Sequence, residues 1–273
     1  HDEELEGSLR EAASHCERKD KNIHVGAAVM PDYLNTHYDP YSSILNREFN
    51  SVVLEHHMKW GPLLVGGDEG VYDFRPCDKV VDWARDHGMT VKGHALCWHQ
   101  AAPDFLESLS ASRLREALYR RGRMTFTTVG HFYGRIEWWD VVNEALSVDC
   151  SGRMEDNVFL RKLGPNYVED CFRVAHQVDP HVKLLYNDNK VEGAGLPDGR
   201  SAKSDAMYNM LKGMKERGVP VHGAGMQSHF TASGIGQYRP PTPHSVQRNV
   251  KRLGDLGLTV NISEMDVRYA DVS

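Results

Sequence analysis

The sequence lacks the features that most readily place a chain in a metal-binding, redox or membrane class. Its 273 residues include five cysteines, and no two of them form a C-x-x-C pair. This absence disfavours a zinc ribbon or a thioredoxin-type site, and the sequence leaves open whether any two cysteines form a disulfide. No apolar run approaches the roughly 18 residues that a membrane-spanning helix needs. The mean hydropathy of −0.52 agrees with the expectation of no membrane partner, and the wide cysteine spacing leads us to expect no metal site.

The chain is mildly acidic and lacks a basic stripe. Lysine and arginine number 32 against 38 acidic residues, which gives a net charge of −6. The densest basic stretch, residues 113–123, fits the solvated face of a helix. Because no basic stripe is available to neutralise phosphates, we expect no nucleic-acid partner. The chain begins at His1 without a signal peptide, and we interpret it as a mature or trimmed form.

A regular alternation of helical and strand-like segments runs through the chain. Glycine follows the ends of several predicted helices, which is typical of helix termination. The strand-like segments are rich in β-branched residues and nearly continuous in apolar character, as in strands covered on both faces. The predicted strands span residues 23–29, 51–55, 90–96, 136–144, 182–188, 224–230 and 259–267. The predicted helices span residues 1–20, 41–50, 77–87, 111–132, 166–177, 201–217 and 242–256.

This alternation without a long linker predicts one α/β domain over residues 1–273 with a parallel sheet. An open, doubly wound sheet would need a glycine-rich turn after its first strand, but Met30-Pro31-Asp32 follows there. A (β/α)8 TIM barrel fits better. Only seven strands can be counted before Ser273, so we expect the eighth strand and helix to be absent from this chain.

Polar side chains follow the predicted strands from the second to the seventh. In a barrel, the carboxyl ends of the strands form the active-site face. Polar residues after one or two strands would be explained as core polar groups or helix caps. Polar residues after six consecutive strands would not. The residues are Glu55, His56 and Lys59; His94, Trp98 and His99; Asn143 and Glu144; Asn187 and Asp188; Gln227 and His229; Glu264 and Asp266.

Two carboxylic acids and an aromatic ring at one face predict a carbohydrate cleft. Aromatic faces stack on the apolar faces of sugars, and short polar side chains bond their hydroxyls. Glu144 and Glu264 are candidates for a pair of catalytic carboxyls. A separation of about 5–5.5 Å supports retaining glycoside hydrolysis and about 6.5–9.5 Å supports inversion. The sequence leaves this choice open.

Four motifs carry a resemblance to a known family. They are residues 93–99 (GHALCWH), 139–145 (WDVVNEA), 225–230 (GMQSHF) and 262–267 (ISEMDV). In this order and spacing the chain resembles glycoside hydrolase family 10, the retaining endo-β-1,4-xylanases, from about residue 25 to residue 268. The resemblance implies a (β/α)8 barrel, no cofactor, and xylan or xylo-oligosaccharide as substrate. It also implies a monomeric, secreted protein.

The resemblance implies catalytic roles for five residues. Glu144 would be the acid/base that protonates the leaving oxygen and then activates water. Glu264 would be the nucleophile that forms the glycosyl-enzyme. Asn143 would hold the 2-hydroxyl of the sugar, and His229, backed by Asp266, would orient Glu264.

The remaining implied residues bind substrate. Gln227 and Asn187 would lie near Glu144. The residues that would line the subsites for the non-reducing part of the substrate are Glu55, His56, Lys59, His94 and Trp98.

Three departures from the family pattern concern substrate binding and leave the reaction type unaffected. Where the family has Glu-Asn, this chain has Glu55-His56. Where the family has Asn-Asp-Tyr-Asn, residues 187–190 of this chain are Asn-Asp-Asn-Lys. The glutamine expected at Ala101 is replaced by a shifted Gln100. Two alternatives therefore stay open. One is a related retaining β-glycosidase acting on glucan or short xylo-oligomers, and the other is a non-catalytic carbohydrate-binding protein.

Overall fold

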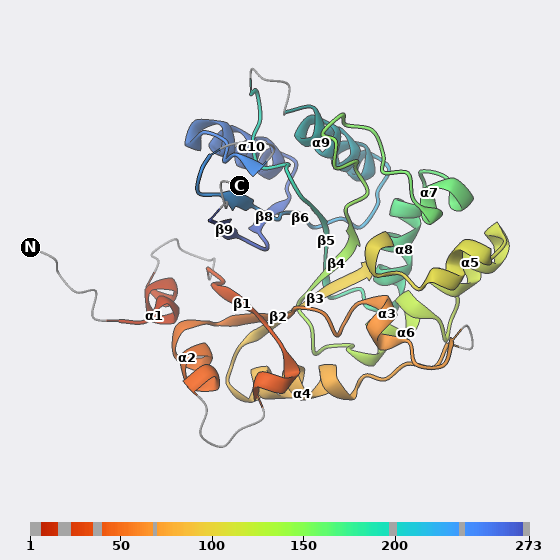
Figure 1. Ribbon diagram of the computed structural model, residues 1–273, viewed down its shortest axis with the longest axis horizontal. Coiled ribbons are helices and arrows are strands. Elements are labelled where there is room, and N and C mark those ends of the chain that lie inside the picture. Colours follow the sequence, from red (N-terminus) through yellow and green to blue (C-terminus); the bar gives the residue numbers. More distant parts are fainter. Residues whose placement is uncertain are drawn as a thin grey trace, which may run out of the picture.

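A curved parallel sheet forms the centre of the molecule (Figure 1). The computed structural model describes residues 7–15, 23–34, 40–67, 70–196, 201–234 and 238–269. Its main sheet has seven strands in chain order, all parallel to their neighbours, as the sequence predicts. They are β1 (Gly26–Val29), β2 (Ser51–Leu54), β3 (Thr90–Cys97), β4 (Trp138–Asn143), β5 (Lys183–Asp188), β6 (Gly223–Met226) and β8 (Thr259–Ile262).

The strands curl around a common interior, and helices cover the outer side of the sheet (Figure 1). None of the helices in the described ranges is long and apolar enough to cross a membrane. The helices are α1 (Leu9–Ser14), α2 (Pro40–Glu48), α3 (Trp60–Leu63), α4 (Arg75–Asp86), α5 (Ala111–Tyr119), α6 (Met124–His131), α7 (Val158–Leu163), α8 (Tyr167–Val178), α9 (Ser201–Glu216) and α10 (Pro243–Asp255). Short 3-10 turns are η1 (Pro31–Leu34), η3 (His99–Ala101) and η4 (Asp104–Ser108).

The central strands are buried on both faces, which explains their continuous apolar sequence. In β5 the five residues from Leu184 to Asp188 are all buried, and in β4 the same holds for the five from Trp139 to Asn143. Parallel alignment brings the carboxyl ends of these strands to one edge. Polar residues at the strand ends therefore meet there, as predicted.

Two predicted strands are in fact two strands each. The segment 224–230 consists of β6 and β7 (His229–Thr231), and 259–267 consists of β8 and β9 (Asp266–Arg268). Ser228 between β6 and β7 has φ +63°, which interrupts an extended chain. The short strands β7 and β9 pair in parallel as a separate ribbon. Glu264 lies in the break between β8 and β9 and lines a cavity on the inner side of the sheet.

Helix predictions also needed correction. The single helix predicted over 111–132 is α5 followed by α6, with Gly122 at φ +81° between them. The helix predicted over 1–20 contains α1, and much of its remainder lies outside the described residues. Helices α3 and α7 have no counterpart among the predicted helices, because their four and six residues are too short for a clear periodicity.

The four cysteines in the described ranges are free thiols. Cys77, Cys97 and Cys171 are buried, and Cys150 is half-buried. Burial raises the pKa of the Cys97 thiol well above its usual value, which disfavours the reactive thiolate.

Gly93 in β3 is required by a close approach of Trp139 in β4. A Cβ atom at position 93 would lie 2.2 Å from Cε3 of the Trp139 ring, which is almost completely buried. We expect Gly93→Ala to lower the free energy of unfolding by about 3 kcal/mol, because the overpacked ring cannot move freely. Gly254→Ala in α10 is the matched control, since a Cβ there meets no atom within 4 Å. Urea unfolding that shows equal stabilities for the two variants would contradict this packing argument.

Candidate active site

The two predicted carboxyl groups stand at the same edge of the sheet, after β4 and β8. Glu144 follows β4 directly and has φ +56°, which turns its side chain away from the strand direction. Glu264 follows β8, and its amide donates to the carbonyl of Gln227 after β6. Glu144 N likewise donates to the carbonyl of Asn187 in β5, so both positions depend on bonds to neighbouring strand ends. This arrangement is typical of barrel enzymes.

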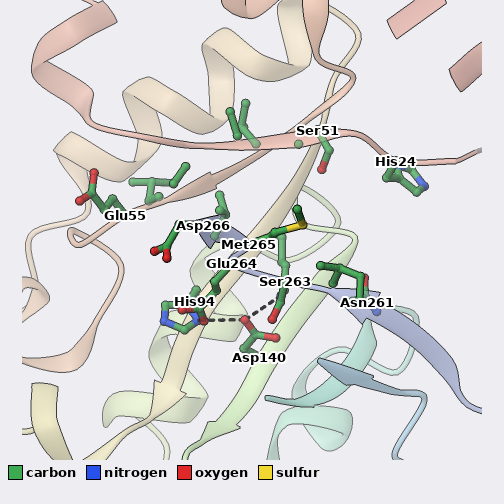
Figure 2. A pocket seen from close by; sticks show the side chains of 18 of the residues that line it. His24, Ser51, Glu55, His94, Asp140, Asn261, Ser263, Glu264, Met265 and Asp266 are labelled. Atoms are coloured by element: carbon green, nitrogen blue, oxygen red, sulfur yellow. Dashed lines mark hydrogen bonds and ion pairs between the residues drawn. The ribbon is translucent and has the colours of Figure 1, made fainter. Parts of the chain in front are cut away.

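A cavity of about 650 Å³ occupies the concave side of the sheet. Figure 2 shows Glu55 toward one end and His24 and Asn261 toward the other, with Glu264 and His94 between them. Of the predicted site residues, the cavity is lined by Glu55, Lys59, His94, Trp98, His229, Glu264 and Asp266. The volume is that of a pocket able to hold a small ligand or sugar units.

A chain of amide hydrogen bonds connects the two carboxyl groups. The Asn187 amide donates to Glu264 Oε1 at 2.6 Å and to Asn143 Oδ1 at 2.9 Å. The Gln227 amide donates to the same Asn143 oxygen at 3.2 Å and to Glu144 Oε1 at 2.8 Å. Each of these two NH2 groups thus uses both hydrogens, and the Asn143 oxygen uses both lone pairs. The NH2 group of Asn143 can still donate to a ligand.

Glu264 is surrounded by groups that favour its ionised form. His229 Nε2 lies 3.2 Å from Glu264 Oε2, and His229 Nδ1 lies 2.8 Å from Asp266 Oδ2. The hydrogen bond to Glu264, together with the Asp266 carboxylate, raises the pKa of His229 despite its burial. Burial alone would raise the pKa of Glu264, but His229, the charge of His94 and the Asn187 bond together lower it to about 2.

Glu144 has neutral partners instead. Trp98 Nε1 and Gln100 Nε2 both donate to Glu144 Oε2, at 3.0 and 3.2 Å, and Gln227 donates to Oε1. No partner among the described hydrogen bonds of this carboxyl carries a charge. The two carboxyl groups therefore differ in environment in the way that separate acid and nucleophile roles require.

His94 is held by a buried carboxylate. Its Nδ1 lies 2.8 Å from Asp140 Oδ2, which also lies 2.9 Å from Lys92 Nζ. Asp140 is completely buried, and Figure 2 shows it beside His94 and near Glu264. His94 Nδ1 is 4.0 Å from Glu264 Oε1, so His94 adds to the positive surroundings of that carboxylate.

Lys59 and His56 differ in their placement. The Lys59 ammonium lies 4.9 Å from the Trp98 ring centroid, in a cation–π contact at the cavity wall. Burial lowers the pKa of Lys59, and the charges of Glu264, Glu55 and Glu144 oppose that effect. His56 is exposed, is not among the described residues that line the cavity, and packs edge-on against His57. Its substrate contact stays a prediction.

Three further residues belong to this site without having been predicted as site residues. Gln100 was noted only as a shifted replacement, yet it bonds Glu144. Ser263 Oγ donates to Asn187 Oδ1 at 2.6 Å and so fixes the orientation of that amide. Asp140 reads as part of an apolar strand. Its position opposite His94 in the parallel register is the signal that could have identified it.

A curled parallel sheet with two carboxyl groups in different surroundings at its carboxyl-terminal edge is typical of the barrel class of glycoside hydrolases. The chain belongs to glycosyl hydrolase family 10, whose model matches residues 13–273. The fold is accordingly that of a (β/α)8 barrel, of which the described residues contain seven strands.

Similar proteins support this assignment. A β-1,4-xylanase of Dictyoglomus thermophilum is 36% identical over 89% of this chain. The chain spans 63% of that relative's length. The crystal structure of native xylanase 10B from Thermotoga maritima is 36% identical, covers 95% of this chain and 74% of its own, and gives a TM-score of 0.83. The crystal structure of xylanase 10B from Thermotoga petrophila in complex with xylobiose gives a TM-score of 0.82 and is 36% identical. It covers 95% of this chain and 73% of its own.

Replacing His229 tests the electrostatic account of Glu264. We expect His229→Gln to raise the pKa of Glu264 by about one unit or more, because a neutral amide replaces a cation. The variant would then protonate Glu264 at a higher pH than the wild type does. Carboxyl-detected ¹³C NMR titration measures this directly. His87→Gln is the control, since His87 lies against Trp83 on α4. A Glu264 pKa equal in both variants would refute the assigned cause.

Proposed function

We propose that the chain is the catalytic part of a retaining endo-β-1,4-xylanase. The observation that carries this proposal is the amide chain through Asn187, Asn143 and Gln227, which joins a carboxylate with cationic neighbours to a carboxyl with neutral ones. Double displacement needs this difference, because one group must attack as an anion while the other delivers a proton. The mechanism needs no cofactor.

In the first step, Glu264 attacks the anomeric carbon of the bound xylose and the glycosidic bond breaks. Glu144 gives its proton to the departing sugar oxygen. His229 and His94 keep Glu264 ionised before the attack. As charge moves from Glu264 to the new ester bond, the Asn187 hydrogen bond keeps its carboxyl in position.

In the second step, Glu144 takes a proton from water, which attacks the anomeric carbon of the glycosyl-enzyme. Glu264 leaves as a carboxylate, and its low pKa makes it a good leaving group. Two successive inversions return the β configuration. The Asn143 NH2 group, with its oxygen already occupied, is the donor for the sugar's 2-hydroxyl.

Xylan or xylo-oligosaccharides are the proposed substrates. Lys59, Trp98, Glu55 and His94 line the cavity beside Glu264 and provide the polar and aromatic contacts that a sugar needs. The xylobiose in the Thermotoga petrophila structure supports this class of ligand. We further expect one catalytic domain, a monomer, and secretion, all from the family resemblance.

Polymer hydrolysis distinguishes the proposed activity from the alternatives. We expect reducing sugars to be released from xylan much faster than from cellulose, and fresh products to carry the β anomer in ¹H NMR. Faster cleavage of cellulose would favour a glucan-specific glycosidase, and an initial α anomer would refute retention. No cleavage of either polymer or of aryl xylosides would favour the binding-protein alternative.

Substituting the nucleophile tests the residue assignment. We expect Glu264→Gln to lower kcat on xylan by about 10³-fold or more, because the amide cannot form the glycosyl-enzyme. Glu116→Gln on the exposed surface of α5 is the matched control and should retain wild-type rates. Wild-type turnover by the Glu264 variant would remove the assignment.

A further inference from the structure

The turn that carries Glu144 is held by three consecutive backbone N–H groups. Glu144 N donates to the Asn187 carbonyl at 2.9 Å, and Ala145 N donates to the Tyr186 hydroxyl at 3.1 Å. Leu146 N donates to Asp188 Oδ2 at 3.2 Å. All three acceptors belong to β5. A non-glycine residue at φ +56° is strained, so a conformation of this kind persists only where its surroundings enforce it.

A buried ion pair supports these acceptors. Asp188 and Lys203 both have no solvent-exposed side-chain surface, and their Oδ1 and Nζ atoms are 2.8 Å apart. The Tyr186 hydroxyl donates to Asp188 Oδ2, the same oxygen that accepts from Leu146 N. Lys203 also donates to Asn189 Oδ1 at 2.9 Å, which connects the pair to the residue after β5.

Asp188, Lys203 and Tyr186 do not belong to the chain of bonds between the two carboxyls, and none of the three is among the residues that line the cavity. An isolated buried ion pair is often no more stabilising than apolar residues of similar size. Here, however, the two oxygens of Asp188 have separate partners: Oδ1 accepts from Lys203 and from Asn189 N, and Oδ2 accepts from Leu146 N and from the Tyr186 hydroxyl, which both hold the turn. Its location therefore matches a positioning function better than a contribution to stability alone.

We propose that Asp188, with Lys203 as its counter-ion and Tyr186 as its bridge, is a positioning residue for Glu144. The inference rests on the proposed function, in which Glu144 is the acid/base. Loss of the Asp188 acceptor frees Leu146 N and lets the turn relax from its left-handed conformation. The Glu144 carboxyl would then leave the position set by Trp98, Gln100 and Gln227 while the chain stays folded.

Substrates with different leaving groups test this role. Phenyl β-xylobioside needs protonation of its leaving oxygen, whereas the 2,4-dinitrophenyl analogue does not. A positioned acid contributes about 10²–10⁴-fold to such steps. We expect Asp188→Asn to lower kcat/KM for the phenyl substrate about 100-fold relative to the wild type. For the dinitrophenyl substrate, kcat/KM should stay within about threefold of the wild-type value. For the dinitrophenyl substrate, kcat and KM of this variant should fall by similar factors. The reason is that Glu144 also activates water in the second step, so the glycosyl-enzyme would accumulate.

Two further variants make the test decisive. Tyr186→Phe removes the hydroxyl bridge at nearly constant volume, and we expect the same selective loss, about tenfold. Asp179→Asn is the matched control: Asp179 is also buried and accepts from the backbone N–H groups of His181 and Val182, but before β5. It should affect both substrates equally, even if it lowers the melting temperature.

The outcomes separate this inference from the proposed function. A wild-type protein that cleaves neither xyloside contradicts the proposed function itself. A wild type that cleaves both, with an Asp188→Asn variant that loses both equally or neither, overturns the positioning role. If Asp188→Asn does not fold, Tyr186→Phe decides in the same way.

Discussion

The hydrogen-bond chain between Glu144 and Glu264 is the constraint on which the rest of the site depends. It uses both hydrogens of two amides and both lone pairs of a third, so no member can rotate without leaving a buried polar group unpaired. Its members come from the ends of β4, β5 and β6 and from the segment after β8. The parallel order of the sheet is what brings these four strand ends together. The fold therefore acts on the chemistry by fixing the relative position of two carboxyl groups.

Different neighbours then give the two carboxyl groups different properties. Glu264 faces His229 and His94, and the network behind each histidine contains a carboxylate, Asp266 or Asp140. Glu144 faces an indole and two amides. A family of barrel glycosidases needs an anion and a proton donor a short distance apart. The same sheet edge supplies both, because His94 of β3 and His229 of β7 present charge at Glu264, whereas the segments after β3 and β6 present neutral groups at Glu144.

Much of this arrangement could be predicted from the sequence. Alternating apolar segments gave the parallel sheet, and the polar residues that end them gave Glu144, Glu264, Asn187, Gln227 and His229. The breaks after β6 and β8 could not be predicted, because backbone dihedrals such as φ +63° at Ser228 leave no periodic signal. The partnership of Asp188 with Lys203 was equally hidden. A lysine on α9 reads as an ordinary helix residue until the fold buries it beside Asp188 at the end of β5.

Covalent trapping tests the central claim most directly. The 2,4-dinitrophenyl glycoside of 2-deoxy-2-fluoro-xylobiose keeps a good leaving group while its fluorine slows the second step, so the glycosyl-enzyme accumulates. Mass spectrometry of the digested protein locates the added sugar. The account predicts one fluoroxylobiosyl group, on the peptide that contains Glu264 and on that side chain. A label on Glu144, or turnover to an inverted product without any label, would contradict it.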